Sequence, residues 1–279
     1  MTMGYHRILS VQDLSCLGQC SATVALPILS ACGQEACLLP TALLSTHTGG
    51  FTDVHRRELT ADLEAICGHW LREELQFDAI YTGYLGDAAQ IELLMEYLPK
   101  LAGPDCRILV DPAMADHGKL YKGFDEAYAA KMVHLCEKAD VLLPNVTEAC
   151  ILTGMPMPDT CDEAQAEVLL KKLSALGPRT VVLTGVDYGE SLTGAAILAE
   201  GKITHCCHEK LPGSCHGTGD IFAAVLVGSW MRLGELTRAV QLAGEFTMRC
   251  IRATREAPAH WYGVKFETQL PWLCRQLET

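Results

Sequence analysis

Short apolar segments alternate with longer helical segments along most of this chain, and that rhythm limits the possible folds more than any other feature. The predicted strands are residues 7–14, 36–44, 77–81, 107–110, 141–143 and 179–183. The predicted helices are residues 21–32, 56–75, 88–97, 124–136, 147–152, 162–176, 219–232, 235–252 and 266–277. Such alternation predicts an α/β fold in which helices cover both faces of a mainly parallel sheet.

The rhythm changes late in the chain, where residues 191–198 and 202–208 predict an antiparallel pair joined at Glu200-Gly201. No internal repeat, low-complexity tract or linker divides the 279 residues. We therefore expect one domain that spans residues 1–279.

Composition excludes several kinds of partner. A net charge of −12 without a lysine or arginine cluster argues against nucleic-acid binding. The sequence starts without a signal peptide and lacks an apolar run of about 18 residues, so we expect a cytoplasmic protein with no membrane span.

The 14 cysteines are expected to be free thiols. The His-Cys-Cys-His run at 205–208 does not predict zinc, because adjacent strand residues point to opposite faces.

A glycine loop precedes the helix predicted at 219–232. Gly217, Thr218 and Gly219 are followed at once by Asp220. Free backbone N–H groups and the helix dipole at such a start suit an anion. A carboxylate would repel a phosphate there, so Asp220 is better explained as a general base at the edge of a phosphate site. The alternative is a glycine turn with Asp220 as a simple N-cap.

Polar and glycine residues gather where the predicted strands end. They are Ser10, Gln12, Thr48, residues 83–86, Asp111, Asn145 and Thr184. In an open α/β sheet these ends meet at one crevice, where ligands bind. Asp111 and Asn145 each adjoin a proline after or at the end of an apolar strand. The sequence contains no P-loop, dinucleotide fingerprint or hydrolase elbow.

Five motifs occur in order along the chain. They are Ser-Thr-His-Thr-Gly at 45–49, Thr-Gly-Tyr-Leu-Gly at 82–86 with Gln90, Asp-Pro-Ala-Met-Ala-Asp at 111–116, Pro-Asn-Val-Thr-Glu at 144–148 with Leu-Thr-Gly at 152–154, and Gly-Thr-Gly-Asp at 217–220. Together they resemble the ribokinase superfamily and, within it, the pyridoxal (vitamin B6) kinase family. The resemblance implies a ribokinase-like three-layer sandwich.

The resemblance also implies an ATP-dependent kinase that phosphorylates the 5′-hydroxymethyl group of pyridoxal, pyridoxine or pyridoxamine with Mg²⁺, and it raises a monovalent cation as a further candidate. It implies that Asp220 is the base and that Gly217, Thr218 and Gly219 form an anion hole that also contacts ATP. On the nucleotide side it implies Asp111 and Glu148 for Mg²⁺ and the ATP phosphates, Asn145 and Thr184 for the nucleotide, and residues 114–123 as a loop that closes over ATP. On the substrate side it implies that Ser10 and Thr48 bind polar groups of the pyridine and that Tyr84 lies beside its ring. It further implies a homodimer.

The chain departs from the family at several positions. Ala115 stands where the family has a glycine, Thr184 stands where close relatives often have lysine, and Cys16 and Cys20 replace other small residues. Cys215 and His216 adjoin the glycine loop, where the thiol is either a ligand contact or, more simply, a packing residue.

Two other functions stay open at this point. The first is a hydroxymethylpyrimidine kinase of thiamine synthesis, which shares the fold and the reaction. The second is a vitamin-binding protein without catalysis, against which the presence of Asp220, Asp111 and Glu148 argues, because binding alone needs no base.

Overall fold

A computed structural model describes residues 4–213, 215–257 and 259–278, and within them nine strands form one sheet in the order β11-β10-β9-β8-β5-β4-β1-β2-β3. These strands are β1 (Arg7–Ser15), β2 (Glu35–Leu44), β3 (Arg56–Glu58), β4 (Phe77–Thr82), β5 (Ala102–Val110), β8 (Val141–Leu142), β9 (Thr180–Asp187), β10 (Leu192–Ala199) and β11 (Lys202–Glu209). A separate small hairpin pairs β6 (Ala115–Asp116) with β7 (Lys119–Leu120).

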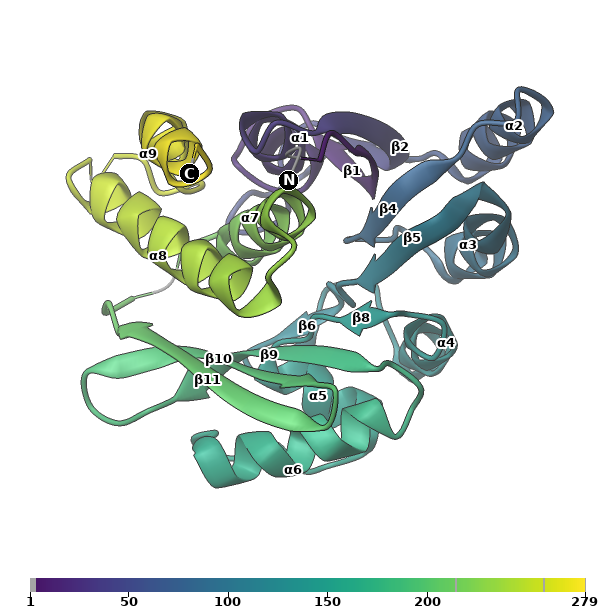
Figure 1. Cartoon of the computed structure of the whole chain (residues 1–279). Coiled ribbons are helices and arrows are strands. Elements are labelled where there is room, and N and C mark those ends of the chain that lie inside the picture. Colours follow the sequence, from purple (N-terminus) through teal and green to yellow (C-terminus); the bar gives the residue numbers. More distant parts are fainter. Residues whose placement is uncertain (1–3, 214, 258, 279) are drawn as a thin grey trace.

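Helices cover both faces of the sheet (Figure 1). On one face lie α1 (Ala22–Ala31), α7 (Thr218–Leu233), α8 (Leu236–Arg255) and α9 (Leu270–Gln276), which follows the short 3-10 helix η1 (Glu267–Gln269). On the other face lie α2 (Thr60–Arg72), α3 (Ala88–Leu101), α4 (Glu126–Cys136), α5 (Val146–Thr153) and α6 (Glu163–Ser174). Each face buries its own hydrophobic cluster against the sheet. This arrangement confirms the predicted ribokinase-like three-layer sandwich with a mainly parallel sheet.

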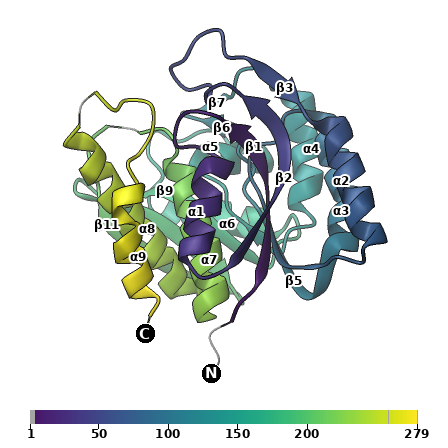
Figure 2. The same cartoon turned by 90° about the horizontal axis from the view of Figure 1, so that it is seen from above.

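The sheet changes direction of growth at β1. The chain passes from β1 to its parallel neighbour β2 and later returns to β4 on the other side of β1. Such a switch point opens a crevice beyond the carboxyl ends of the strands. Figure 2 shows the connection from β2 to β3 and the β6–β7 hairpin at this same edge. The topology therefore brings the predicted strand-end residues to one place.

Several elements differ from their predicted bounds: α3 continues to Leu101 and β9 to Asp187, α9 begins at Leu270, and two further differences follow. Residues 56–75 were expected to form one helix, but residues 56–58 form β3, which pairs antiparallel with the end of β2, and α2 begins at Thr60. A three-residue edge strand leaves no periodic pattern, so its residues looked like the first turn of the amphipathic helix behind them. Strand β5 begins at Ala102 rather than at residue 107, because Ala102 pairs with Phe77 despite a Gly-Pro pair that resembles a loop.

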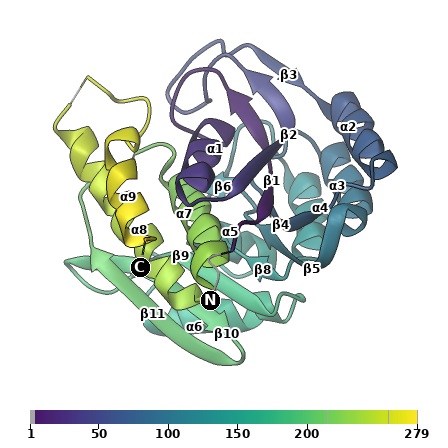
Figure 3. The same ribbon diagram turned by 45° about the horizontal axis from the view of Figure 1, so that its top comes forward.

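The predicted antiparallel pair near the end of the chain is confirmed by β10 and β11, whose register joins Ala199 to Lys202. This hairpin and β3 lie at opposite ends of the sheet (Figure 3). All 14 cysteines are free. Among the helices of the described residues, none has the length and apolarity that crossing a bilayer requires.

Candidate active site

The glycine loop forms the start of α7, and its backbone is open to a ligand. Gly217 is the N-cap residue, and its φ of +83° is a left-handed conformation that favours glycine. A Cβ atom added to Gly217 would lie 1.9 Å from the carbonyl oxygen of Gln19, so a side chain does not fit there. Within the described residues no side chain caps this helix, which leaves its first N–H groups free for an anion.

Asp220 lies in the first turn of α7 rather than at its N-cap, so the alternative in which it simply caps the helix is wrong. Burial raises the pKa of its carboxyl to about 7, and the nearby carboxylate of Asp13 adds to this increase. The backbone N–H of Ser21 opposes part of the shift. A carboxyl with a pKa close to neutrality suits a general base.

Asp111 and Glu148 add two further carboxyls beside Asp220. Asp111 follows β5 directly, and one of its oxygens accepts a hydrogen bond from the N–H of Ala113 at 3.1 Å. Burial, together with repulsion from Glu148 and Asp220, raises the pKa of Asp111 well above its ordinary value. Burial raises the pKa of Glu148 to about 7. The structure thus gathers three predicted site residues into one region of excess negative charge.

Asn145 and Glu148 hold each other at the start of α5 in a capping box. Asn145 Oδ1 accepts the N–H of Glu148, and Glu148 Oε2 accepts the N–H of Asn145, each at 3.0 Å. Their remaining polar atoms reach the base of the β6–β7 hairpin. Glu148 Oε1 accepts the N–H of Met114 at 2.9 Å, and Asn145 Nδ2 donates to the carbonyl of Ala115 at 2.8 Å. Both residues therefore fasten this hairpin to the site.

Thr184 comes to the same edge of the sheet through an isolated parallel bridge with Asn145. Its hydroxyl donates to the carbonyl of Pro144 at 3.4 Å, so the side chain lies against the backbone of the neighbouring strand end. The two residues predicted to contact the nucleotide are thus adjacent in space although they lie far apart in the sequence.

Ser10 lies on β1 opposite Tyr81 of β4, at the switch point of the sheet. The Ser10 hydroxyl, the Tyr81 hydroxyl and the side-chain amide of Gln12 are buried close together, and the Ser10 hydroxyl has no hydrogen-bond partner among the described residues. Burial raises the pKa of the Tyr81 hydroxyl most, and the negative charges of Asp111 and Asp220 raise it further. Since buried polar atoms almost always have partners, the Ser10 hydroxyl is expected to bond to a ligand or to water.

Thr48 is exposed on the connection between β2 and β3, and its neighbours fix that loop over the site. His47 Nδ1 accepts the N–H of Gly49 at 3.1 Å, so Nε2 carries the hydrogen that faces the carbonyl of Tyr262 at 2.6 Å. A Cβ atom added to Gly49 would lie 2.5 Å from the imidazole of His216. The loop that carries Thr48 therefore lies directly against the residue that precedes the glycine loop.

Tyr84 is half-buried on the turn that follows β4. Its ring stacks on Phe124 at a centroid distance of 5.4 Å, and Phe124 stacks on Tyr128 at 3.8 Å. Burial raises the pKa of the Tyr84 hydroxyl to about 12, so it stays protonated at neutral pH.

Cys215 is also half-buried and packs against the core on the α7 face. Burial raises the pKa of its thiol, which disfavours the reactive thiolate. This environment favours the packing interpretation of Cys215 over a covalent one.

Sequence reasoning missed several residues of this region. Asp13 is 4% exposed and accepts the Ser15 hydroxyl at 2.9 Å, yet it looked like one more polar residue at the end of a strand. Tyr81 has the pattern of an ordinary core aromatic within an apolar run. Arg56 lies in the segment that the sequence predicts as a helix, but it is the first residue of strand β3. The only signal was the Ser-x-Gln-Asp sequence of residues 10–13, which is unusually polar for the end of a buried strand.

Comparison with known proteins agrees with this architecture. Residues 26–264 match the family model described as phosphomethylpyrimidine kinase. A pyridoxine/pyridoxal/pyridoxamine kinase from Bordetella avium is 31% identical over 268 residues, which cover 90% of this chain and 86% of the relative. The crystal structure of pyridoxal kinase from Lactobacillus plantarum superposes with a TM-score of 0.90 at 35% identity, covering 98% of both chains. A Bacteroides thetaiotaomicron structure, whose description names both phosphomethylpyrimidine kinase and pyridoxal, gives 0.91 at 36% identity, covering 97% of this chain and 96% of that one.

Proposed function

This chain belongs to the phosphomethylpyrimidine kinase family, and on that basis we propose that it is a pyridoxal kinase. It transfers the γ-phosphoryl group of ATP to the 5′-hydroxymethyl group of pyridoxal, pyridoxine or pyridoxamine. The observation that carries the proposal is the position of Asp220, a carboxyl with a pKa of about 7 in the first turn of an uncapped helix. A base and an anion site are thereby joined in one short segment.

The reaction needs little covalent chemistry from the protein. As the hydroxymethyl oxygen attacks the γ-phosphorus and the bond to ADP breaks, Asp220 takes the hydroxyl proton. The N–H groups of residues 217–219 stabilise the charge on the transferred phosphoryl. A positioned base contributes about 10²–10⁴-fold, and loss of one such N–H donor costs about 10²–10³-fold. Positioning and charge stabilisation supply most of the catalysis in phosphoryl transfer.

The carboxyl-rich edge fits a magnesium ion. The strongest charge effects on Asp111 come from Glu148 and Asp220, so a cation bound there would relieve their repulsion. The described residues hold no group of three or more His, Cys, Asp or Glu side chains that could bind a metal by themselves. This agrees with Mg²⁺, which is commonly held by one or two carboxylates together with nucleotide phosphates. When bound, the ion neutralises phosphate charge.

We assign Asp111 to hold the Mg²⁺ that would accompany the ATP phosphates. The oxygens of Glu148 already accept backbone N–H groups, so Glu148 contributes its charge and fixes the base of the β6–β7 hairpin. Asn145 and Thr184 lie beside that hairpin and line the nucleotide side. Residues 114–123, which include the hairpin, would close over ATP.

The substrate ring is proposed to lie between β1 and the turn after β4. The unpartnered hydroxyl of Ser10 supports a polar contact with the ring, and Tyr84 supplies an aromatic wall. Thr48 would contact the ring from the loop that His47 fastens to Tyr262. We also propose that the protein is cytoplasmic and forms a homodimer. Light scattering on the purified protein measures its molar mass and so tests the homodimer directly.

Steady-state phosphorylation of pyridoxal, pyridoxine, pyridoxamine and hydroxymethylpyrimidine, measured side by side, tests the assignment. We expect turnover of the three vitamin B6 forms. Turnover of the pyrimidine alone would favour the thiamine-pathway kinase. ATP-independent binding of pyridoxal without turnover of any of the four alcohols would favour a vitamin-binding protein.

A further inference from the structure

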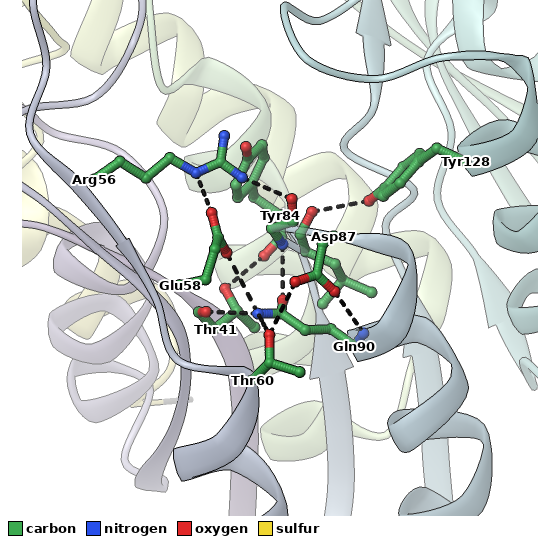
Figure 4. Close-up of polar contacts among 10 residues, drawn as sticks. Thr41, Arg56, Glu58, Thr60, Tyr84, Asp87, Gln90 and Tyr128 are labelled. Atoms are coloured by element: carbon green, nitrogen blue, oxygen red, sulfur yellow. Dashed lines mark hydrogen bonds and ion pairs between the residues drawn. The ribbon is translucent and has the colours of Figure 1, made fainter.

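Arg56 makes three contacts with the substrate side of the site that no motif predicted. It is the first residue of β3, and it pairs with Leu44 at the end of β2. Its Nη2 donates to the carbonyl of Gly86 at 2.6 Å, its Nε forms an ion pair with Glu58, and its guanidinium lies 5.6 Å from the centre of the Tyr84 ring. Figure 4 shows the guanidinium directed toward the turn that carries Tyr84.

Side chains from three different elements hold this turn by its carbonyl groups. Thr41 of β2 donates to the carbonyl of Tyr84 at 2.9 Å, and Tyr128 of α4 donates to the carbonyl of Leu85 at 3.0 Å. Arg56 of β3 donates to the next carbonyl, that of Gly86. Three successive peptide groups are therefore fixed from outside the turn, which determines where the Tyr84 ring stands.

Arg56 is the member of this set that also touches the ring. A guanidinium placed over an aromatic ring is attracted to its π-system. Phe124 stacks on the Tyr84 ring as well, so the ring has both an aromatic and a cationic neighbour. The Arg56 side chain is 30% exposed, and a pair as exposed as Arg56 and Glu58 adds little to folding stability. Its contacts are directed at the position of Tyr84 rather than at the core.

Asp13 connects this set with the reacting centre. The negative charge of Asp13 contributes an increase to the pKa of Arg56, of Tyr84 and of Asp220. In the proposed function the substrate ring lies beside Tyr84, with its hydroxymethyl group directed at Asp220.

We propose that Arg56 is a positioning residue that holds the Tyr84 ring as a wall of the substrate site, and so sets the affinity for the ring alcohol. This inference rests on the proposed function. The guanidinium bonds in two directions at once, toward the Gly86 carbonyl and toward Glu58, while its central carbon lies 5.6 Å from the centre of the Tyr84 ring. The single ammonium group of lysine cannot reproduce this geometry.

Steady-state kinetics of Arg56→Ala, with Arg57→Ala as the matched control, tests the proposal. Arg57 is the adjacent exposed residue of the same strand, and successive strand residues point to opposite faces. We expect Arg56→Ala to raise the KM for pyridoxal about tenfold, the loss expected for one charge-assisted hydrogen bond, with kcat and the KM for ATP changed less than about twofold. Arg57→Ala should stay within about twofold of wild type in all three parameters.

Two further variants separate positioning from other effects. Arg56→Lys should resemble Arg56→Ala, and a wild-type KM in this variant would overturn the geometric role. In a Tyr84→Ala background, Arg56→Ala should have little additional effect on KM, because both changes remove the same wall. An undiminished tenfold effect in that background would also overturn the proposal. Melting temperatures within about 2 °C of wild type would exclude misfolding as the cause.

Wild-type turnover distinguishes failure of this inference from failure of the proposed function. If wild type phosphorylates only hydroxymethylpyrimidine, the function is wrong, and the same variants measured with that alcohol decide the role of Arg56. If wild type phosphorylates pyridoxal and Arg56→Ala leaves its KM unchanged, the function stands and the inference is wrong.

Discussion

Separate replacement of the two loop glycines tests whether the start of α7 is a binding site. In Gly217→Ala, a left-handed φ of +83° would have to be adopted by alanine, at a cost of about 1–2 kcal/mol. The new Cβ would also lie 1.9 Å from the Gln19 carbonyl oxygen, and because backbone must then move, overpacking adds about 1–3 kcal/mol. The free energy of unfolding should therefore fall by about 2–5 kcal/mol.

This loss converts to a measurable melting shift. A chain of 279 residues has an unfolding entropy of about 0.6 kcal/mol/K, so Gly217→Ala should melt about 3–8 °C below wild type. Gly219→Ala is the matched control, since a Cβ atom there meets open space and the residue lies within a helix. Alanine is the better helix former by about 0.5–1 kcal/mol, so this variant should melt at or slightly above the wild-type temperature.

Turnover should separate the two variants in the opposite sense. Because helical Cβ atoms tilt toward the N-terminus of the helix, the methyl group of Gly219→Ala should point toward the free N–H groups, and kcat should fall roughly tenfold or more in a fully folded enzyme. Scanning calorimetry and steady-state phosphorylation measure the two effects. An unchanged melting temperature in Gly217→Ala would refute the strain argument. Full turnover in Gly219→Ala would refute the placement of the transferred phosphoryl at this helix start.

Three other perturbations address the carboxyl groups. Asp220→Ala should lower kcat by several orders of magnitude, because loss of a positioned base alone costs about 10²–10⁴-fold. ATP binding, measured by calorimetry, should stay nearly unchanged. Residual turnover of one-tenth of wild type would contradict the base assignment. Because Asp220 must be ionised to take a proton, kcat/KM should rise with pH through about 7, and Asp13→Asn should move that rise to lower pH by removing a neighbouring negative charge. An unmoved profile in Asp13→Asn would show that burial alone sets this pKa. Glu148→Gln loses charge-assisted bonds to the N–H groups of Met114 and Asn145. The KM for ATP should therefore rise about tenfold, and the melting temperature should fall. Wild-type values of both would contradict the role of Glu148 in fastening the β6–β7 hairpin.

The sequence predicted the layers of this fold because its long elements carry strong periodic patterns. Asp87 and Asp162 each cap a helix by accepting an N–H bond, and such caps mark helix starts without any knowledge of the tertiary structure. Strand β3 escaped prediction for the opposite reason. It exists only because the end of β2 offers it a partner, and that pairing is a tertiary fact.

The site was predictable in part for a similar reason. Asp111, Asn145 and Asp220 follow recognisable strands or a glycine loop, so the parallel topology alone brings them together. Arg56 and His47 act through contacts with Gly86 and Tyr262, which their own local sequence does not encode. Glu148 was found as a site residue, but its bonds to the base of the β6–β7 hairpin required coordinates.

The bond between His47 and the Tyr262 carbonyl affects the order in which the chain can fold during synthesis on the ribosome. Synthesis proceeds from the amino terminus, and the two partners are separated by 215 positions. Strands β1 and β2 can form early, and bonds between Ser45 and His55 can close the loop that joins β2 to β3. The bond from His47 to Tyr262 forms only when the segment after α8 has emerged. A nascent chain therefore completes the loop that carries Thr48 only after its glycine loop has been synthesised. Truncation of the chain before Tyr262 would leave the start of α7 in place and release the loop that carries Thr48, which we propose to contact the alcohol.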